Sequence, residues 1–438
     1  MVFVLDANRQ PLDPCHPARA RQLLKAGKAA VLRRYPFTII LRDRQVSDST
    51  THGHRTKLDP GSKTTGIAVL NEITGRVVWA AELTHRGQKV RDALRSRRQL
   101  RRSRRGRKTR YREARFDNRR RREGWLPSSL ESRVTNIETW VKRLMRFCPV
   151  EAISMELVRF DTQLIQNPEI SGVAYQQGEL AGYEVREYLL EKWGRRCAYC
   201  GATDVPLEVE HIVPRSRGGS DRVSNLTIAC HDCNQEKDNR TADEYGVFKH
   251  KDFSHIARQA KTPLRDAAAV NTTRWALFKR LKGLNLPIET GTGGRTKHNR
   301  TRIGLPKVHW LDAACVGAST PEKLFTAGIN PLTIKATGHG ARQMARPDKY
   351  GFPRGHRQRV KRYFGFQTGD MARAVVTSGK KAGTYVGRVA IRATGSFNIQ
   401  TVSGTVQGLN HRFFTPLHRA DGYQYAEEER RLPPHIRR

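Results

Sequence analysis

The sequence predicts a multidomain α/β protein organised around a small ββα unit that a metal ion holds together. Two Cys-x-x-Cys pairs, Cys197/Cys200 and Cys230/Cys233, enclose a strand pattern and lead into a helix. A long Arg-rich segment follows a β-hairpin and precedes a helix and a strand, and the C-terminal part changes to short strands typical of a small β-barrel. The length of 438 residues allows two to four domains.

Residues 1–52 form the first expected unit, which is small and basic. Its composition indicates little more than anion binding. Its expected elements are a strand (2–5), a turn (11–14), a basic helix (18–26) that Gly27 ends, and two further strands (29–32 and 37–41).

Residues 53–85 have the pattern of a β-hairpin, and Asp59 lies at its first bend. An acidic residue at a turn usually caps the backbone. A catalytic role for Asp59 therefore depends on partners elsewhere in the chain.

Residues 86–123 carry the densest positive charge. Within 86–122, 19 of 37 residues are Lys or Arg and three are acidic, which supplies +16 of the formal charge of +40. The segment is internal, lacks proline and has apolar residues at near-helical spacing, so we expect a helix that RNA or DNA orders. Arginine outnumbers lysine, which favours bidentate phosphate contacts. The candidate contacts are Arg91, Arg95, Arg97, Arg98, Arg101, Arg102, Arg104 and Arg105.

Residues 124–185 combine an amphipathic helix around 137–144 with a strand over 150–158. On that strand, Glu156 shares a face with small residues, from which it could approach Asp59.

Residues 186–245 hold the cysteine pairs, and a helix expected over 176–192 leads into them. Four thiolates at this spacing favour a closed tetrahedral Zn²⁺ site, which folds a segment with too little core of its own. A zinc ribbon that only binds and a redox pair are the competing interpretations. The expected ligands are Cys197, Cys200, Cys230 and Cys233.

The segment between the cysteine pairs carries polar residues in the order of an HNH nuclease. Glu210 and His211 end a strand pattern, Asn225 follows, and Asn234 comes directly after the last cysteine. A neutral imidazole can take a proton from water, a carboxylate and an amide oxygen can hold Mg²⁺, and a second amide can orient the imidazole. The run Glu-His-Ile-Val-Pro-Arg-Ser favours the nuclease over the ribbon.

Residues 246–318 begin with helical patterns and continue with a Gly/Thr/Arg-rich stretch, 291–302, which we expect to be a mobile loop. His309 and Asp312 follow on one face of a helix. Three separated acids with a histidine beside the last are what a two-Mg²⁺ phosphodiesterase needs, and here these are Asp59, Glu156, Asp312 and His309.

Residues 319–438 are expected to form a C-terminal SH3-like barrel. Their aromatic and arginine content suits contact with nucleic acid, and a purely structural barrel is the alternative.

The composition favours a polyanionic partner, because a formal charge of +40 would repel itself in a compact monomer. A membrane surface is the competing polyanion, but no run of 18 apolar residues and no signal-peptide pattern occurs. Seven cysteines, four of them committed to metal, do not form a disulfide framework. We therefore expect a cytoplasmic, nucleoid-associated protein that binds nucleic acid.

The order of these motifs over essentially the whole chain resembles the IscB family of transposon-associated, RNA-guided DNA endonucleases, which are related to the CRISPR single-protein nucleases. The resemblance implies a split RuvC domain of RNase H fold in residues 53–85, 124–185 and 300–318. Linker helices would form the rest of 246–318, with a bridge helix in 86–123 and an inserted HNH domain in 186–245. Residues 1–52 would be the N-terminal unit, and 319–438 would contact RNA and a flanking DNA motif.

The resemblance also implies roles for the site residues. Asp59, Glu156 and Asp312 look like the RuvC magnesium ligands, and His309 like the histidine that assists them. In the HNH unit, His211 looks like the general base, Glu210 and Asn234 like Mg²⁺ ligands, and Asn225 like the supporting residue. Two departures from the family pattern occur: Asp13 replaces a methionine of the N-terminal signature, and Glu210 stands where aspartate is common.

By the same resemblance, a guide RNA (an omega RNA) would pair with one strand of target double-stranded DNA beside a short flanking motif. HNH would cut the paired strand and RuvC the displaced strand, in a complex of one protein with RNA. Two other functions compete: a homing or junction-resolving nuclease without RNA, and a repressor whose catalytic sites have decayed. All expected catalytic positions are filled, which argues against the repressor.

Overall fold

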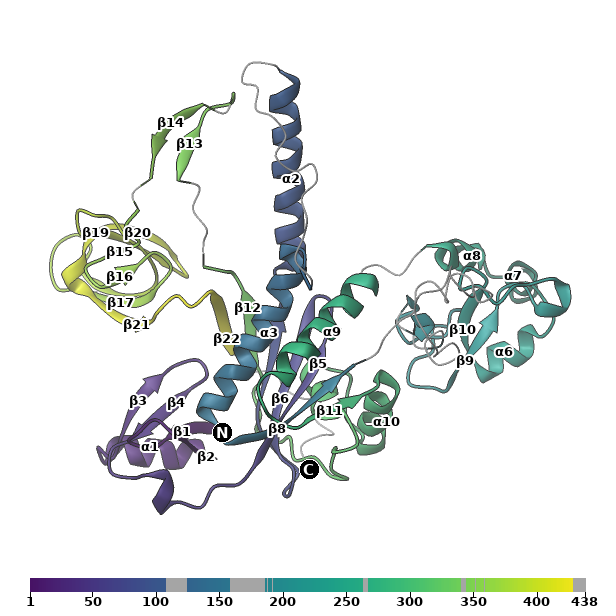
Figure 1. The fold of residues 1–438 in the computed structure, drawn as a ribbon, viewed down its shortest axis with the longest axis horizontal. Coiled ribbons are helices and arrows are strands. Elements are labelled where there is room, and N and C mark those ends of the chain that lie inside the picture. The colour runs from purple at the N-terminus through teal and green to yellow at the C-terminus, as the bar shows by residue number, and fades with distance from the viewer. Residues whose placement is uncertain are drawn as a thin grey trace. The chain divides into compact units, whose positions relative to one another are not determined.

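The structure is a computed structural model that describes residues 1–107, 124–157, 186, 188–190, 192–262, 267–339, 344–350, 352–357 and 359–427. The chain divides into two compact units. Unit 1 comprises Met1–His54, Arg76–Glu151 and Thr326–Arg438, and unit 2 comprises Arg55–Gly75 and Ala152–Phe325. Figure 1 shows the elements of both.

Unit 1 opens with a four-stranded sheet in the order β2-β1-β4-β3. The expected strands and helix of this region are confirmed. The elements are β1 (Val2–Leu5), β2 (Pro11–Cys15), α1 (Pro17–Lys25), β3 (Ala29–Arg33), β4 (Thr38–Leu41) and the short 3₁₀ helix η1 (Val46–Asp48).

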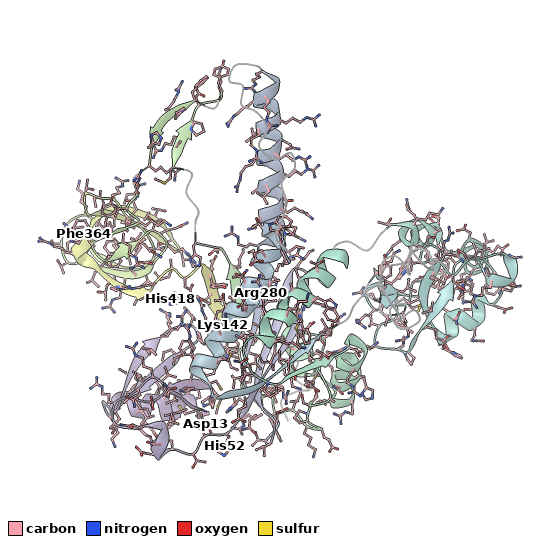
Figure 2. All side chains as sticks on the ribbon, viewed as in Figure 1. Asp13, His52, Lys142, Arg280, Phe364 and His418 are labelled. Atoms are coloured by element: carbon pink, nitrogen blue, oxygen red, sulfur yellow. The ribbon has the colours of Figure 1, made fainter. Side chains whose placement is uncertain are left out.

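The expected turn at residues 11–14 is wrong, because Pro11–Cys15 is strand β2. Its prolines are tolerated since β2 lies at the edge of the sheet, where a missing backbone N–H breaks no ladder. The reversal occurs earlier, where the Asp6 carboxylate accepts a hydrogen bond from the Gln10 backbone at 2.7 Å. Asp13, on β2, accepts a hydrogen bond from the backbone N–H of His52 at 3.0 Å, and both residues are labelled in Figure 2.

Unit 1 also contains three neighbouring strands, β7 (Arg76–Thr84), β12 (Leu332–Ala336) and β22 (Tyr423–Glu427). Strand β12 pairs in parallel with β7 and antiparallel with β22. The helices of this unit are α2 (Gly87–Gly106) and α3 (Ser128–Phe147). The apolar face predicted for α3 is buried, and Trp140 stacks on Trp79 with ring centroids 5.8 Å apart.

The C-terminal part of unit 1 has the short antiparallel strands that the sequence predicts. Five of them form one sheet, in the order β20-β19-β18-β17-β21, around a core that includes Phe397 and Ile399. The elements are β13 (Ala345–Pro347), β14 (Pro353–His356), β15 (Arg362–Tyr363), β16 (Phe366–Gln367), β17 (Met371–Val376), β18 (Gly383–Ala390), β19 (Ser396–Thr401), β20 (Gly404–Asn410), η4 (His411–Phe413) and β21 (Phe414–His418).

In unit 2, four neighbouring strands lie in the order β11-β8-β5-β6. The hairpin predicted around Asp59 is confirmed, since β5 pairs antiparallel with β6 and Asp59 lies opposite Gly66. The elements are β5 (His54–Pro60), β6 (Thr64–Asn71), β8 (Val150–Glu156), α9 (Ala267–Lys282), β11 (Ile288–Gly291), α10 (Gly293–Ile303) and α11 (His309–Ala314).

The mobile loop expected at residues 291–302 is also wrong, because Gly293–Ile303 is helix α10. Thr292 caps its start by accepting a hydrogen bond from the Arg295 backbone, and Gly304 ends it in the left-handed conformation, at φ +76°. Asn299 is buried and donates to the carbonyl oxygens of Cys315 and Gly317, both at 2.9 Å. These tertiary contacts order a segment whose composition is that of a loop.

The cysteine-containing part of unit 2 has the predicted ββα arrangement. Strand β9 (Leu207–His211) pairs antiparallel with β10 (Leu226–Cys230), and α6 (His231–Lys237) follows. The 3₁₀ helix η3 (Arg215–Arg217) and the helices α7 (Ala242–Lys249) and α8 (Ser254–Lys261) complete it. Most of the helix expected over 176–192, and the basic segment after residue 107, lie outside the described residues.

Within the described ranges, no helix combines the length and the apolar character that a membrane span requires.

Candidate active sites

The four cysteines form a compact cluster that fits zinc. Their sulfur atoms all lie within 4.8 Å of one another, and the Sγ atoms of Cys200 and Cys230 are 3.7 Å apart. A tetrahedral ion with Zn–S bonds of about 2.3 Å would separate its sulfurs by roughly 3.8 Å. The spacing and the all-thiolate donor set therefore match a closed structural site.

His211, the predicted base, is the last residue of β9 and contacts an acid that the sequence analysis missed. Its Nε2 lies 2.8 Å from the carboxylate of Asp221. Arg215 donates to the same carboxylate oxygen from Nε at 2.8 Å. Hydrogen bonds from His211 and then from Arg215 lower the pKa of Asp221, so this carboxylate is held in its charged form.

Asn225 holds the loop after His211 rather than the imidazole itself. Its side-chain oxygen accepts from the Val213 backbone N–H at 2.9 Å, and its amide donates to the carbonyl oxygens of Val213 and Ser220 at 3.0 and 2.9 Å. One amide thus closes the loop that carries Arg215 and Asp221.

The two expected magnesium ligands of this unit have separate partners. Glu210 is buried, accepts a hydrogen bond from Tyr199 at 2.6 Å and pairs with Lys237 at 2.5 Å. Burial raises the pKa of Glu210, and Lys237 opposes that shift. Asn234 instead donates to Glu208 at 2.7 Å.

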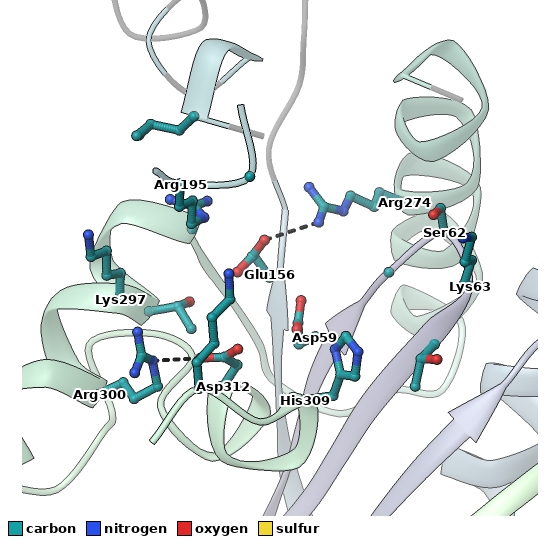
Figure 3. Close-up of a pocket in the computed structure, with 17 residues that line it drawn as sticks. Asp59, Ser62, Lys63, Glu156, Arg195, Arg274, Lys297, Arg300, His309 and Asp312 are labelled. Carbon is teal, nitrogen blue, oxygen red and sulfur yellow. Dashed lines mark hydrogen bonds and ion pairs between the residues drawn. The ribbon is translucent and has the colours of Figure 1, made fainter. Parts of the chain in front are cut away.

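Unit 2 holds a second set of predicted residues around one cavity of about 430 Å³. Asp59 near the end of β5, Glu156 at the end of β8, and His309 and Asp312 on α11 all line it (Figure 3). The structure therefore brings together four residues that the sequence separates widely. Their carboxylates line the same cavity but do not converge as tightly as the four cysteine sulfurs. Among the described residues, the cysteines are the group whose ligand atoms lie close enough together to hold one metal ion.

A close approach of α11 to β6 places His309. A Cβ atom on Gly66 would lie 1.8 Å from the backbone oxygen of His309, so only glycine permits this packing. Trp310, Leu311, Ala313 and Ala314 of the short helix are buried, whereas His309 and Asp312 line the cavity. The helix therefore turns His309 and Asp312 toward the cavity.

Two buried arginines hold the carboxylates of this cavity (Figure 3). Arg274 of α9 donates to Glu156 at 3.0 Å, and Nε of Arg300 of α10 lies 2.9 Å from Asp312. Burial raises the pKa of Asp312, Arg300 opposes the shift and the nearby Glu156 adds to it. The two acids therefore interact across the cavity.

Four residues of these sites were not predicted from the sequence: Arg274, Arg300, Asp221 and Lys237. Arg300 was hidden because its helix was interpreted as a loop, although Thr292 before it and Gly304 after it are helix-capping signals. For Arg274, Asp221 and Lys237, the charge of the side chain did not indicate which residue it would contact.

Helix α2 has the expected basic character. Gly87–Gly106 carries eight arginines and one lysine against one acid. The predicted contacts Arg91, Arg95, Arg97, Arg98, Arg101 and Arg102 are exposed, and Arg104 and Arg105 are half-buried. Figure 2 shows long side chains extending from α2 over most of its length.

Comparisons with known proteins identify two segments. Residues 2–178 match the family model described as RRXRR protein, and residues 197–240 match that described as HNH endonuclease. No curated protein matches the chain.

Similar solved structures include the Streptococcus thermophilus Cas9 in complex with the GGAA PAM, at 14% identity and a TM-score of 0.23, over 60% of this chain and 32% of that one. Another is the type II-C Cas9 enzyme from Actinomyces naeslundii, at 17% identity and a TM-score of 0.16, over 43% of this chain and 28% of that one. The chain thus spans about a third of the length of these proteins. It joins a segment that matches the RRXRR family model to a segment that matches the HNH endonuclease model.

Proposed function

We propose that the chain is an RNA-guided DNA endonuclease of the IscB type with two nuclease sites. The observation that carries the nuclease class is the HNH match over residues 197–240, which includes Glu210, His211, Asn225 and Asn234. The charge of +40 and the exposed arginines of α2 favour a nucleic acid that stays bound.

In the HNH site, His211 takes the proton of the attacking water. Its Nε2–H donates to Asp221, which leaves Nδ1 as the basic atom. Glu210 and Asn234 would hold Mg²⁺, and for this Glu210 has to exchange its contact with Lys237. When bound, Mg²⁺ supplies Lewis-acid stabilisation of the charge that develops on the scissile phosphate.

The second site is the cavity of Asp59, Glu156, Asp312 and His309, in a RuvC-type domain assembled from residues 53–85, 124–185 and 300–318. Its three carboxylates would hold metal ions, and His309 would move a proton at the phosphate. Their common cavity supports this assignment, because the three acids come from separate elements.

The guide RNA would pair with one DNA strand, which HNH cuts, while the second site cuts the displaced strand. Residues 86–123 would bind the RNA as a bridge helix, and residues 319–438 would contact RNA and the flanking DNA motif. The alternative is a homing or junction-resolving nuclease that reads DNA without RNA.

Strand-specific cleavage tests the two sites. His211→Ala should leave cutting of the displaced strand, and Asp59→Ala should leave cutting of the guide-paired strand, on a duplex labelled separately on each strand. The RNA that copurifies with the protein supplies the guide sequence. Loss of both cuts in either variant would contradict two independent sites, and sequence-specific cutting by RNA-free protein would favour the alternative.

Salt dependence tests the role of α2. Binding of the copurified RNA should weaken with salt at a log–log slope of about −0.7 to −0.9 per phosphate contacted. Replacing Arg97, Arg98, Arg101 and Arg102 by Gln should reduce both the slope and the affinity. An unchanged slope would place the RNA contacts elsewhere.

A further inference from the structure

Arg274 joins two strand ends that carry acids of the cavity. Its side chain is buried, its Nε donates to the backbone oxygen of Pro60 at 3.2 Å, and its Nη2 donates to Oε1 of Glu156 at 3.0 Å. Pro60 directly follows Asp59 on β5, whereas Glu156 ends β8. One guanidinium from α9 therefore fixes the Asp59 end of β5 relative to Glu156.

Arg300 repeats this pattern at the third acid. It is buried, its Nη1 donates to the backbone oxygen of Leu305 at 3.0 Å, and its Nε lies 2.9 Å from Oδ1 of Asp312. Leu305 lies in the segment that connects α10 to α11, the helix of His309 and Asp312. Each arginine thus contacts one carboxylate and donates a hydrogen bond to one backbone carbonyl oxygen.

The contacts leave one oxygen of each acid for another ligand. Arg274 donates to Oε1 of Glu156 and Arg300 lies against Oδ1 of Asp312, and among the described residues no hydrogen bond or ion pair engages Oε2 of Glu156 or Oδ2 of Asp312. A carboxylate fixed through one oxygen has lost most of its rotational freedom before a cation arrives. The second oxygen is then presented in one direction.

We propose that Arg274 and Arg300 are positioning residues of the acidic cavity, which hold Glu156 and Asp312 so that their second oxygens can bind a divalent cation. This inference rests on the proposed function of the cavity. A lysine would not substitute, because a guanidinium offers several donors in a rigid plane, whereas an ammonium is a point charge on a flexible stem.

The charge of the arginines provides a sharp test, because charge and geometry predict opposite results. A neighbouring positive charge repels a cation, so if charge alone mattered, Arg274→Met should tighten cation binding and Arg274→Lys should change nothing. If Arg274 positions Glu156, both substitutions should weaken binding, on the order of tenfold as for other partners of metal ligands.

The probe is Mn²⁺ alone, titrated into the full chain and followed by the electron paramagnetic resonance signal of the free ion. Binding that Asp59→Ala removes defines the cavity. Arg274→Lys, Arg274→Met, Arg300→Lys and Arg300→Met are compared with Lys279→Met on α9 and Arg302→Met on α10, whose side chains are exposed. The two control variants should retain the wild-type affinity.

Displaced-strand nicking gives a second measurement. The arginine variants should need about tenfold more Mg²⁺ for half-maximal rate and should recover much of the rate at saturation. A lower rate at every Mg²⁺ concentration with unchanged Mn²⁺ affinity would show that the arginines contact substrate instead, and would overturn the proposal.

Folding and function are separated by two further results. Zinc content and thermal melting identify a variant that does not fold. If an Arg→Met variant does not fold, the charge-conserving Arg→Lys variant still tests the positioning role. If Asp59→Ala binds Mn²⁺ like the wild type, the proposed nuclease function of the cavity fails. If Asp59→Ala loses Mn²⁺ while the arginine variants retain it, the positioning role alone fails.

Discussion

At the scale of single residues, the HNH unit shows how a partner changes what a side chain can do. Glu208 and Glu210 lie two positions apart on β9, but Glu208 is half-exposed and bonds to Asn234 and His231, whereas Glu210 is buried against Lys237 and Tyr199. Lys237 also donates to the backbone oxygen of His211 at 2.9 Å. A single buried ammonium therefore links the expected metal ligand to the expected base.

Asp221 should affect the rate of the His211-dependent cut. Asp221→Ala removes the acceptor at Nε2, so the ring loses its fixed tautomer and orientation, and we expect the single-turnover rate on the guide-paired strand to fall about tenfold. Asp232→Ala, which removes an exposed carboxylate from α6, is the matched control and should keep the rate. Equal rates in Asp221→Ala and the wild type would show that the imidazole needs no such partner.

At the scale of elements, the cysteine cluster and helix α10 are stabilised by different contacts. The four thiolates join β10, α6 and the turn at Cys197, beside a hydrophobic core that includes Tyr199 and Tyr245, and a zinc ion would link them. Helix α10 depends on its caps and on buried polar contacts of Asn299 and Arg300.

Zinc should be necessary for the fold of the ββα unit. We expect about one zinc per chain in purified protein, and loss of that zinc together with the His211-dependent cut in Cys230→Ser. Cys15→Ser removes a cysteine outside the cluster and should leave the zinc content unchanged. Full zinc retention in Cys230→Ser would rule out the four-thiolate site.

The end of α10 should be sensitive to a methyl group. Gly304 has φ +76° and open space around its missing side chain, so Gly304→Ala meets no clash, and its cost of about 1 kcal/mol is conformational. Gly106→Ala, at the end of α2 and also without a steric neighbour, should have a neutral or stabilising effect. Hydrogen exchange of the α10 amides measures the difference, and equal protection in Gly304→Ala and wild type would contradict it.

At the scale of the whole molecule, one carboxylate connects distant parts of unit 1. Asp421 accepts from Arg33 of β3 at 2.8 Å and from Tyr425 of β22 at 2.5 Å, and it pairs with Arg143 of α3 at 3.0 Å. Burial would raise the pKa of Asp421, but the nearby His418, the hydrogen bond from Tyr425 and the charge of Arg143 lower it well below its usual range. The N-terminal sheet, α3 and the last strand therefore meet at one negative charge.

This contact predicts a pH-dependent stability. Because the folded pKa of Asp421 is depressed, its contribution is fully present above the unfolded pKa of about 3.9 and is lost as pH falls toward the folded value. Asp421→Asn should cost about 2 kcal/mol at pH 7, and the difference from wild type should shrink below about pH 4.

Near-ultraviolet circular dichroism of Trp140, which lies 6.0 Å from Tyr425 between ring centroids, follows unit 1 during melting. Asp348→Asn, in the turn between β13 and β14, is a control because Asp348 caps a local turn. A constant difference between Asp421→Asn and wild type down to pH 3 would show that Asp421 is not ionised by these partners.

The sequence by itself determined the cysteine cluster, the order of the HNH residues, the hairpin of Asp59 and the charge of α2, because cysteine spacing, strand alternation and net charge are properties of neighbouring residues. Only the tertiary structure decided that Pro11–Cys15 is an edge strand and that Gly293–Ile303 is a helix, since the sheet edge and the buried contacts of Asn299 stabilise them. It also decided the partners of the acids. Arg274 meets Glu156 across 118 positions of sequence, and packing, not local pattern, selects which of the chain's 81 basic residues becomes buried beside a carboxylate.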